Sequence, residues 1–254
     1  MGIFKRFKPR EVQLELKKVH DYCASKTPVV TVVFVHGIAT DASCFTNTIK
    51  YLEGTASLKN VRFVAFDLLG SGKSYTSDDL NYDFHDQITA LHNSINNLHL
   101  DTPLVLVGHS MGALITIRYA DTYKKSCKHL ILVSPPVYRP EDIENPKFMI
   151  GIKLFKDAVS INNHKILKEK SFNNSIDKIV LNKYNYGRFI NLKTHATIIY
   201  GEMDRFIGAK NIPHILKENS KYLVAIKTAG RHGMSKDKYS KMVGVLEDII
   251  NDVS

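Results

Sequence analysis

Short runs of apolar, largely β-branched residues alternate along the chain with longer segments in which apolar residues recur at helical spacing. Uninterrupted apolar runs of strand length are typical of strands that are buried on both faces of a parallel sheet. Six such runs predict strands, at Val29–Val35, Val61–Phe66, Leu104–Val107, Leu130–Val133, Ala196–Tyr200 and Tyr222–Lys227. A different pattern precedes them, because residues 11–17 alternate Val12, Leu14 and Leu16 with polar residues, which predicts a half-exposed antiparallel edge strand.

Helical periodicity fills most of the intervals between these strands. The predicted helices lie around Asp86–Leu98, Gly112–Tyr123, Ala209–Lys217 and Tyr239–Val253. Alternating strands and helices predict an α/β fold, with a doubly wound, mostly parallel sheet covered by helices on both faces. Residues 138–195 break the alternation, since lysine-rich helical sequence replaces the next strand. We therefore expect a helical lid, inserted after the sixth strand, on a core made of residues 1–137 and 196–254.

The composition is that of an ordinary folded domain. Of 254 residues, 44% are hydrophobic and 24% charged, which excludes a disordered or fibrous protein. The three cysteines, Cys23, Cys44 and Cys127, lack the spacing of a disulfide framework or a zinc knuckle, which favours a cytoplasmic setting. No apolar run reaches the length of a signal peptide or a membrane span, so we expect neither export nor integral membrane association.

Positive charge is concentrated in two segments. The 35 Lys and Arg residues outnumber the 25 Asp and Glu residues, for a formal net charge of +10. Residues 1–18 contribute +4 and residues 138–195 contribute +5, which leaves the rest of the chain nearly neutral. We interpret the basic N-terminus at residues 5–10 as a solvated tail, with weak contact to an anionic surface as the alternative. The chain carries no nucleic-acid recognition motif, so we expect no nucleic-acid partner.

A serine occupies the turn between a predicted strand and a predicted helix. The segment Leu104–Ala113 reads LVLVGHSMGA, which puts Ser110 in a G-x-S-x-G motif. Gly108 and Gly112 let the strand and the helix approach closely, as a sharp, strained turn requires if it is to expose the serine hydroxyl at the carboxyl edge of the sheet. The N-terminus of the following helix favours developing negative charge. This pattern predicts Ser110 as a nucleophile.

A serine nucleophile needs a base that removes its proton and an acid that orients the base. In this architecture the acid follows a later strand and the histidine comes last. Asp204 follows the predicted strand 196–200, and His232 follows the predicted strand 222–227. Glu202 remains a rival for the acid. We favour Asp204 because its side chain is shorter and it lies farther past the strand end.

Two backbone N–H groups are candidates for binding the oxyanion that forms when a carbonyl is attacked. One belongs to Met111, directly after the serine, and the other to Ile38 in the loop after the first central strand. Gly37 lets the backbone of that loop turn close to the reacting centre. The candidate residues of a substrate pocket are Phe45, His109, Tyr138 and Ile207. Phe45 is equally compatible with the core.

Two features bear on substrate preference. Arg205 follows the predicted acid and Arg231 precedes the predicted histidine. We interpret both as solvated side chains, with a positive rim for a carboxylate or phosphate as the alternative. The insertion also carries an apolar helical face, interpreted either as a roof over the pocket or as the packing surface of the lid itself. That face comprises Phe148, Met149, Ile150, Ile152, Leu154 and Phe155.

Five segments together resemble those of a known family. HGI, DLLGSGKS, GHSMGA, GEMD and RHG occur here in the order and spacing of the α/β-hydrolase superfamily, and the resemblance covers about residues 11–252. The chain is similar in particular to small bacterial cytosolic hydrolases known as esterases or as relatives of carbon–carbon bond hydrolases. The resemblance implies Ser110 as nucleophile, His232 as general base and Asp204 as its partner, with Ile38 and Met111 as oxyanion donors. A serine where haloalkane dehalogenases and epoxide hydrolases carry aspartate counts against those two activities.

We therefore expect a serine hydrolase that cleaves a carboxylic ester of a small-molecule substrate through an acyl-enzyme, with no cofactor. His92 and His99 share a helix face without a third ligand nearby, so we expect no metal site. A thioesterase or a carbon–carbon bond hydrolase is the alternative within this class. A slow-turnover ligand-binding or regulatory protein on the same fold is the alternative from another class.

Overall fold

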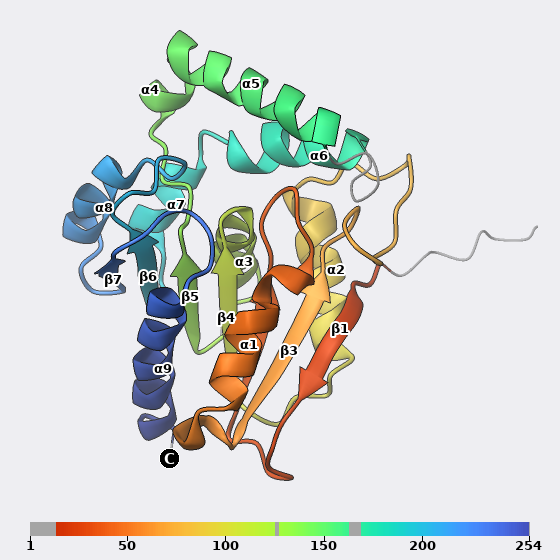
Figure 1. Cartoon of the computed structure of the whole chain (residues 1–254), viewed down its shortest axis with the longest axis vertical. Coiled ribbons are helices and arrows are strands. Elements are labelled where there is room, and N and C mark those ends of the chain that lie inside the picture. The colour runs from red at the N-terminus through yellow and green to blue at the C-terminus, as the bar shows by residue number, and fades with distance from the viewer. Residues whose placement is uncertain (1–13, 125–126, 163–168, 254) are drawn as a thin grey trace, which may run out of the picture.

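The computed structural model describes residues 14–124, 127–162 and 169–253. Its strands and helices alternate along the chain (Figure 1). The strands are β1 (Lys17–Tyr22), β2 (Val30–Val35), β3 (Val61–Asp67), β4 (Leu104–His109), β5 (His129–Val133), β6 (Ala196–Gly201) and β7 (Leu223–Thr228). The α-helices are α1 (Thr46–Glu53), α2 (Phe84–Asn96), α3 (Met111–Thr122), α4 (Pro140–Ile143), α5 (Pro146–Asn162), α6 (Glu169–Ser175), α7 (Asn185–Asn191), α8 (Ile212–Glu218) and α9 (Lys236–Asn251). The shorter helical turns are η1 (Ala42–Phe45), η2 (Ala56–Leu58), the π-helix η3 (Ile176–Val180) and η4 (Ala209–Asn211). Within the described ranges, no helix combines the length and the apolar character needed to cross a bilayer.

The strands form one sheet in the order β1-β3-β2-β4-β5-β6-β7. Every neighbouring pair is parallel except β1 with β3. The chain runs outward from β2 to β3 and then returns to β4 on the other side of β2, so the strand order reverses between β2 and β4. Where the strand order reverses, the connections from two neighbouring parallel strands lead to opposite sides of the sheet, which leaves a crevice at the carboxyl ends of those strands. The loop after β2 and the turn after β4 meet at this crevice.

The antiparallel edge strand exists, but its predicted position at residues 11–17 was wrong. It spans Lys17–Tyr22 and pairs with β3. Two of the apolar residues that suggested the earlier position, Leu14 and Leu16, contact α2 instead. Leu16 is buried and its N–H donates to Ser94 Oγ at 2.7 Å, while the Leu14 carbonyl accepts from Asn93 Nδ2 at 3.0 Å. Residues 11–13 and the basic residues 5–10 lie outside the described part of the chain.

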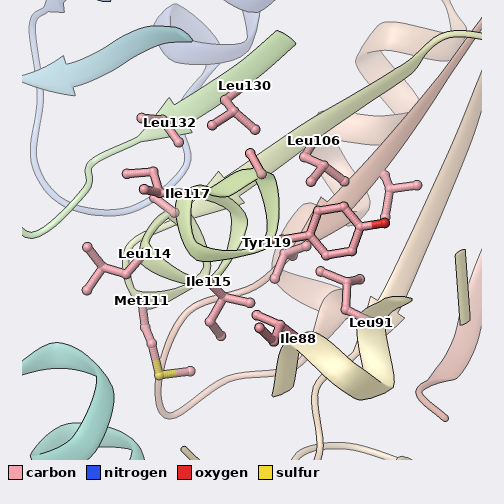
Figure 2. Packing of buried hydrophobic residues seen from close by; sticks show 14 of the residues in the cluster. Ile88, Leu91, Leu106, Met111, Leu114, Ile115, Ile117, Tyr119, Leu130 and Leu132 are labelled. Atoms are coloured by element: carbon pink, nitrogen blue, oxygen red, sulfur yellow. The ribbon is translucent and has the colours of Figure 1, made fainter. Parts of the chain in front are cut away.

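An apolar layer covers each face of the sheet. Helices α1 and α9 cover one face, and α2, α3 and α8 cover the other (Figure 1). Figure 2 shows α3 packed between the sheet and α2. The labelled side chains there are Met111, Leu114, Ile115, Ile117 and Tyr119 of α3, Leu106, Leu130 and Leu132 of the sheet, and Ile88 and Leu91 of α2. This packing fixes the N-terminus of α3 against the end of β4.

Residues 138–195, which we call the helical insertion, contain α4, α5, α6, η3 and α7. Helices α5 and α6 lie across the carboxyl ends of the parallel strands (Figure 1). Helix α7 packs against α3 and α8 and buries Phe189 completely. The insertion follows the fifth strand, β5, and not the sixth as expected. Counted with the edge strand, Leu130–Val133 was already the fifth predicted strand, so the expected position was a miscount; in the structure His129–Val133 is likewise fifth.

Candidate active site

Ser110 lies at the turn between β4 and α3. Its backbone angles are φ 53° and ψ −121°, a conformation that a residue with a side chain adopts only under strain. The turn is also tight, because a Cβ on Gly108 would lie 2.5 Å from the Ala113 Cα. A Cβ on Gly112 would lie 2.1 Å from the Val35 carbonyl oxygen. Only glycine fits at these two positions, so the turn holds Ser110 at the carboxyl edge of the sheet, beside β2.

Two loops bring a histidine and a carboxylate to this serine. His232 follows β7, and its Nε2 lies 2.9 Å from Ser110 Oγ. Asp204 follows β6, and its Oδ2 and Oδ1 lie 3.0 and 3.2 Å from His232 Nδ1. With Nδ1–H donating to the carboxylate, the neutral ring presents Nε2 as the acceptor for the serine hydroxyl. The three residues predicted to be catalytic therefore form one hydrogen-bonded chain.

The two candidate acids lie in different environments. The Asp204 side chain is fully buried, and burial by itself raises the pKa of a carboxyl. The hydrogen bond and charge of His232, together with the Phe206 N–H, outweigh burial and hold the Asp204 pKa below its ordinary value. The Glu202 side chain is half exposed and lies 3.4 Å from Lys227 Nζ. The carboxylate against His232 is thus Asp204.

Both proposed oxyanion donors lie beside the serine. A Cβ on Gly37 would come within 3.0 Å of the Ser110 Cβ, so the backbone that leads into Ile38 lies directly over the turn. Ile38 lines the cavity described next. Met111 is the first residue of α3, and its side chain is buried in the apolar layer below (Figure 2). This leaves the Met111 backbone N–H as the group that can face a reacting carbonyl.

A cavity of about 580 Å³ opens above Ser110, between the sheet edge and the helical insertion. Its wall is mainly apolar, and α5 supplies part of it through Phe148, Ile152 and Phe155. The neighbouring α5 residues Ile150 and Leu154 are exposed at 60% and 63%. The other lining residues are Gly37, Ile38, Ala39, Thr40, Cys44, His109, Ser110, Pro136, Tyr138, Lys147, Gly151, Ile176, Val180, Arg205, Phe206, His232, Gly233 and Met234.

Two of the four residues expected in the pocket line this cavity, His109 and Tyr138. The other two, Phe45 and Ile207, belong to the apolar core instead. The Asp41-capped turn η1 folds Phe45 inward, where its ring centroid lies 5.0 Å from that of Phe34. Ile207 is fully buried, and its carbonyl accepts from the Val137 N–H at 2.7 Å. Both side chains are therefore core residues and not part of the cavity wall.

Some of the cationic side chains near the site line the cavity, and others do not. Arg205 lines it, and so does Lys147 from the start of α5. Neither forms an ion pair with another residue in the described ranges. Arg231 is exposed and is not part of the wall. Among the described residues that line the cavity, none is acidic.

Two further ionisable groups contact the His232 loop. His109 is buried, and its Nε2 lies 3.0 Å from the His232 carbonyl oxygen. Burial, with the neighbouring His232, lowers the His109 pKa to about 4, so the ring is neutral at neutral pH. Lys238 of α9 is completely buried and donates to the same carbonyl. Sequence reasoning missed it, although it occupies a core position at helical spacing from Met242 and Val245.

A comparison with protein families matches residues 30–160, just over half of the chain, to the alpha/beta hydrolase fold. The chain is also similar to an Arabidopsis thaliana protein named probable lysophospholipase BODYGUARD 5. The two are 38% identical over 124 residues, which cover 47% of this chain and 27% of the relative. The chain thus spans about a quarter of the length of the curated Arabidopsis relatives that it matches.

Solved structures resemble most of the chain. A monoacylglycerol lipase from Paleococcus ferrophilus superposes with a TM-score of 0.67 at 19% identity, over 94% of this chain and 100% of that one. An esterase from Exiguobacterium antarcticum gives a TM-score of 0.69 at 17% identity, over 93% and 95%. At such identities the likeness concerns the fold.

Proposed function

Because the chain belongs to the α/β-hydrolase fold family, we propose that it is a serine hydrolase that cleaves carboxylic esters through an acyl-enzyme. The observation that carries this proposal is the hydrogen-bonded chain from Ser110 through His232 to Asp204. Such a chain turns a poorly nucleophilic hydroxyl into a nucleophile, because the histidine takes its proton as the new bond forms.

In the first half of the reaction, Ser110 Oγ attacks the ester carbonyl carbon while His232 Nε2 takes the hydroxyl proton. The imidazolium is stabilised by the buried Asp204 carboxylate. The carbonyl oxygen becomes an oxyanion, which the backbone N–H groups of Ile38 and Met111 bind. Collapse of this intermediate breaks the bond to the alcohol, which leaves with the proton that His232 returns, and the acyl group stays on Ser110.

In the second half, water replaces the alcohol. His232 removes a proton from the water as its oxygen attacks the acyl carbon, and the same oxyanion donors are used again. The serine oxygen then leaves with the proton that His232 carries. The products are a carboxylic acid and the free enzyme, so the reaction consumes one water molecule and needs no other reactant.

The wall of the cavity supports a substrate with one apolar chain and an anionic group. The aromatic and aliphatic face of α5 suits an acyl chain, whereas Lys147 and Arg205 are unpaired cations in a wall without acidic residues in its described part. A phosphate or carboxylate on the alcohol side would pair with them. The name of the Arabidopsis relatives, probable lysophospholipase, fits this chemistry, since a lysophospholipid carries one acyl ester and a phosphate. In this proposal the helical insertion acts as the lid over the bound chain.

Steady-state hydrolysis of p-nitrophenyl esters from acetate to laurate tests the proposal, with wild type beside Ser110→Ala. We expect multiple turnovers in wild type and their loss in the variant. Alanine has the same Cβ as serine, so the strained backbone at φ 53° changes little and the fold should persist, as circular dichroism can verify. No turnover by a folded wild type, or unchanged turnover in folded Ser110→Ala, would refute the proposal.

A further inference from the structure

Lys238 is a lysine in a position where burial is costly. It lies in the first turn of α9, and its side chain is completely buried. A buried ammonium group loses its hydration, so it must find hydrogen-bond acceptors inside the protein. Within the described part of the chain, Lys238 forms no ion pair, and its acceptors are neutral oxygens.

Those acceptors surround the proposed general base. Lys238 Nζ lies 2.6 Å from the Arg231 carbonyl oxygen, 3.2 Å from that of His232 and 2.9 Å from that of Gly233. A fourth acceptor, Ser134 Oγ at 2.8 Å, follows β5. One ammonium group therefore contacts three consecutive peptide carbonyls of the loop that carries His232 and ties that loop to the end of the central sheet.

Other contacts fix the ends of this loop but do not replace the ammonium. At the entry, the Gly230 carbonyl accepts from the Met203 N–H at 3.0 Å. Farther back, the Ala229 N–H donates to Asp237 Oδ2 at 3.2 Å. At His232 itself, the carbonyl also accepts from His109 Nε2. The peptide groups on both sides of the histidine thus converge on Lys238, and their orientation decides where the imidazole points.

We propose that Lys238 is a positioning residue for catalysis, whose ammonium group holds the loop so that His232 Nε2 points at Ser110 Oγ. This inference rests on the proposed function. It is not a catalytic role, because Lys238 is not among the residues that line the cavity.

The charge of Lys238 gives the proposal a pH signature. Burial lowers its pKa to about 8, against the opposing attraction of Asp204. The ionisable groups whose charge acts on it are Asp204 and His109. It also contacts the His232 carbonyl oxygen, and Asp237, which precedes it on the same helix, accepts from the Ala229 N–H. As pH rises through about 8, the cation becomes a neutral amine that donates fewer and weaker hydrogen bonds. Activity should therefore fall on this limb.

The stability should change in the opposite direction. In the unfolded chain a lysine keeps its proton to about pH 10.4, so between pH 8 and that value the unfolded state binds more protons at this site than the folded state. The contribution of Lys238 to stability consequently rises over this interval. A residue that merely supports the fold would make activity and stability rise or fall together.

The test compares wild type with Lys238→Met, which keeps the length of the side chain and removes the charge. Lys241→Met is the matched control, because it removes an exposed cation from the same helix. The readouts are the second-order rate of labelling of Ser110 by a fluorophosphonate and the kcat and KM for a p-nitrophenyl ester, from pH 6.5 to 9.5. Labelling requires the nucleophile and its base but no particular substrate.

We expect Lys238→Met to lower the labelling rate and kcat by roughly 10- to 100-fold with little change in KM. Its activity should also no longer fall as the pH rises through about 8. Lys241→Met should match wild type. Equal labelling of Lys238→Met and wild type, or an identical limb in both, would overturn the proposal. If Lys238→Met does not fold, the proposal is overturned by wild-type enzyme whose labelling rate and kcat do not change between pH 7 and 9.5. Absence of labelling in folded wild type would instead refute the proposed function.

Discussion

Each ionisable side chain around His232 has its charge set by its own partners. Asp204 is buried but accepts hydrogen bonds from His232 and Phe206, and it stays ionised. His109 is buried with a neutral carbonyl as its partner, and it stays uncharged at neutral pH. Burial alone would make both groups neutral. At Asp204 the hydrogen bonds and the charge of His232 outweigh burial, whereas at His109 the single bond to a carbonyl does not. Asp204 is therefore the ionised partner that can stabilise a His232 imidazolium.

This reasoning separates two carboxylates that are two residues apart. We expect Asp204→Asn to lower kcat by roughly 10³- to 10⁴-fold, because the amide favours the wrong tautomer of His232. The matched control is Glu202→Gln, which removes only a half-exposed pair with Lys227 and should change kcat by less than about twofold. Ester hydrolysis at saturating substrate measures both, and a larger loss in Glu202→Gln would contradict the assignment of the acid.

At the scale of helices and strands, the local sequence pattern predicted the strands whose position depends on the local sequence alone. The six parallel strands were expected within about a residue or two of their observed ends, because short apolar, β-branched runs favour strands. One of them, β7, is an edge strand and is only partly buried. Helix α1 was missed because eight residues hold too few apolar positions to show a period. The edge strand was displaced because Leu14 and Leu16 pack on α2, a contact 78 residues away in sequence for Leu16.

Local sequence pattern also limited what could be predicted of the candidate active site. Ser110, Asp204 and His232 could be predicted because each follows a strand at the same sheet edge, where the fold must bring them together. Phe45 was left open between pocket and core, and the placement of Ile207 in the pocket was wrong. Both lie in segments that follow a strand, where the sequence does not show which way a side chain points. Lys238 was missed because a lysine at a core position becomes informative only when its partners are known.

Helix α5 offers a prediction at this scale, since its two faces meet different surroundings. Phe155 lines the cavity, whereas its neighbour Leu154 is 63% exposed. We expect Phe155→Ala to lengthen the acyl chain that is hydrolysed fastest, because each additional methylene that becomes buried is worth about 0.8 kcal/mol, or roughly fourfold in kcat/KM. The p-nitrophenyl ester series measures this, and Leu154→Ala should leave the optimum unchanged. The same optimum in both variants and wild type would show that α5 does not border the acyl chain.

Across the whole molecule, the buried His36 and the half-buried His129 connect loops and strands through hydrogen bonds while uncharged. His36 connects two loops, since its Nε2 accepts from the Leu68 N–H at 2.8 Å and its Nδ1 lies 2.8 Å from the Gly37 carbonyl oxygen. His129 contacts Thr197 between β5 and β6. Burial is the largest cause of the lowered pKa at both, to about 4 for His129. Protonation of either ring therefore costs the folded protein stability.

We expect the free energy of unfolding to fall as pH drops from about 6.5 to 4. In this interval His36 and His129 bind protons more readily in the unfolded chain than in the folded protein, because folding lowers both pKa values. The unfolded state therefore binds more protons, and stability declines with falling pH. A ring with a pKa of about 4 accounts for roughly 3 kcal/mol of this loss. Urea unfolding followed by circular dichroism at each pH measures it. His129→Gln should flatten the slope, whereas the exposed His85→Gln should not. An unchanged slope in His129→Gln would mean that its ring already binds a proton in the folded protein.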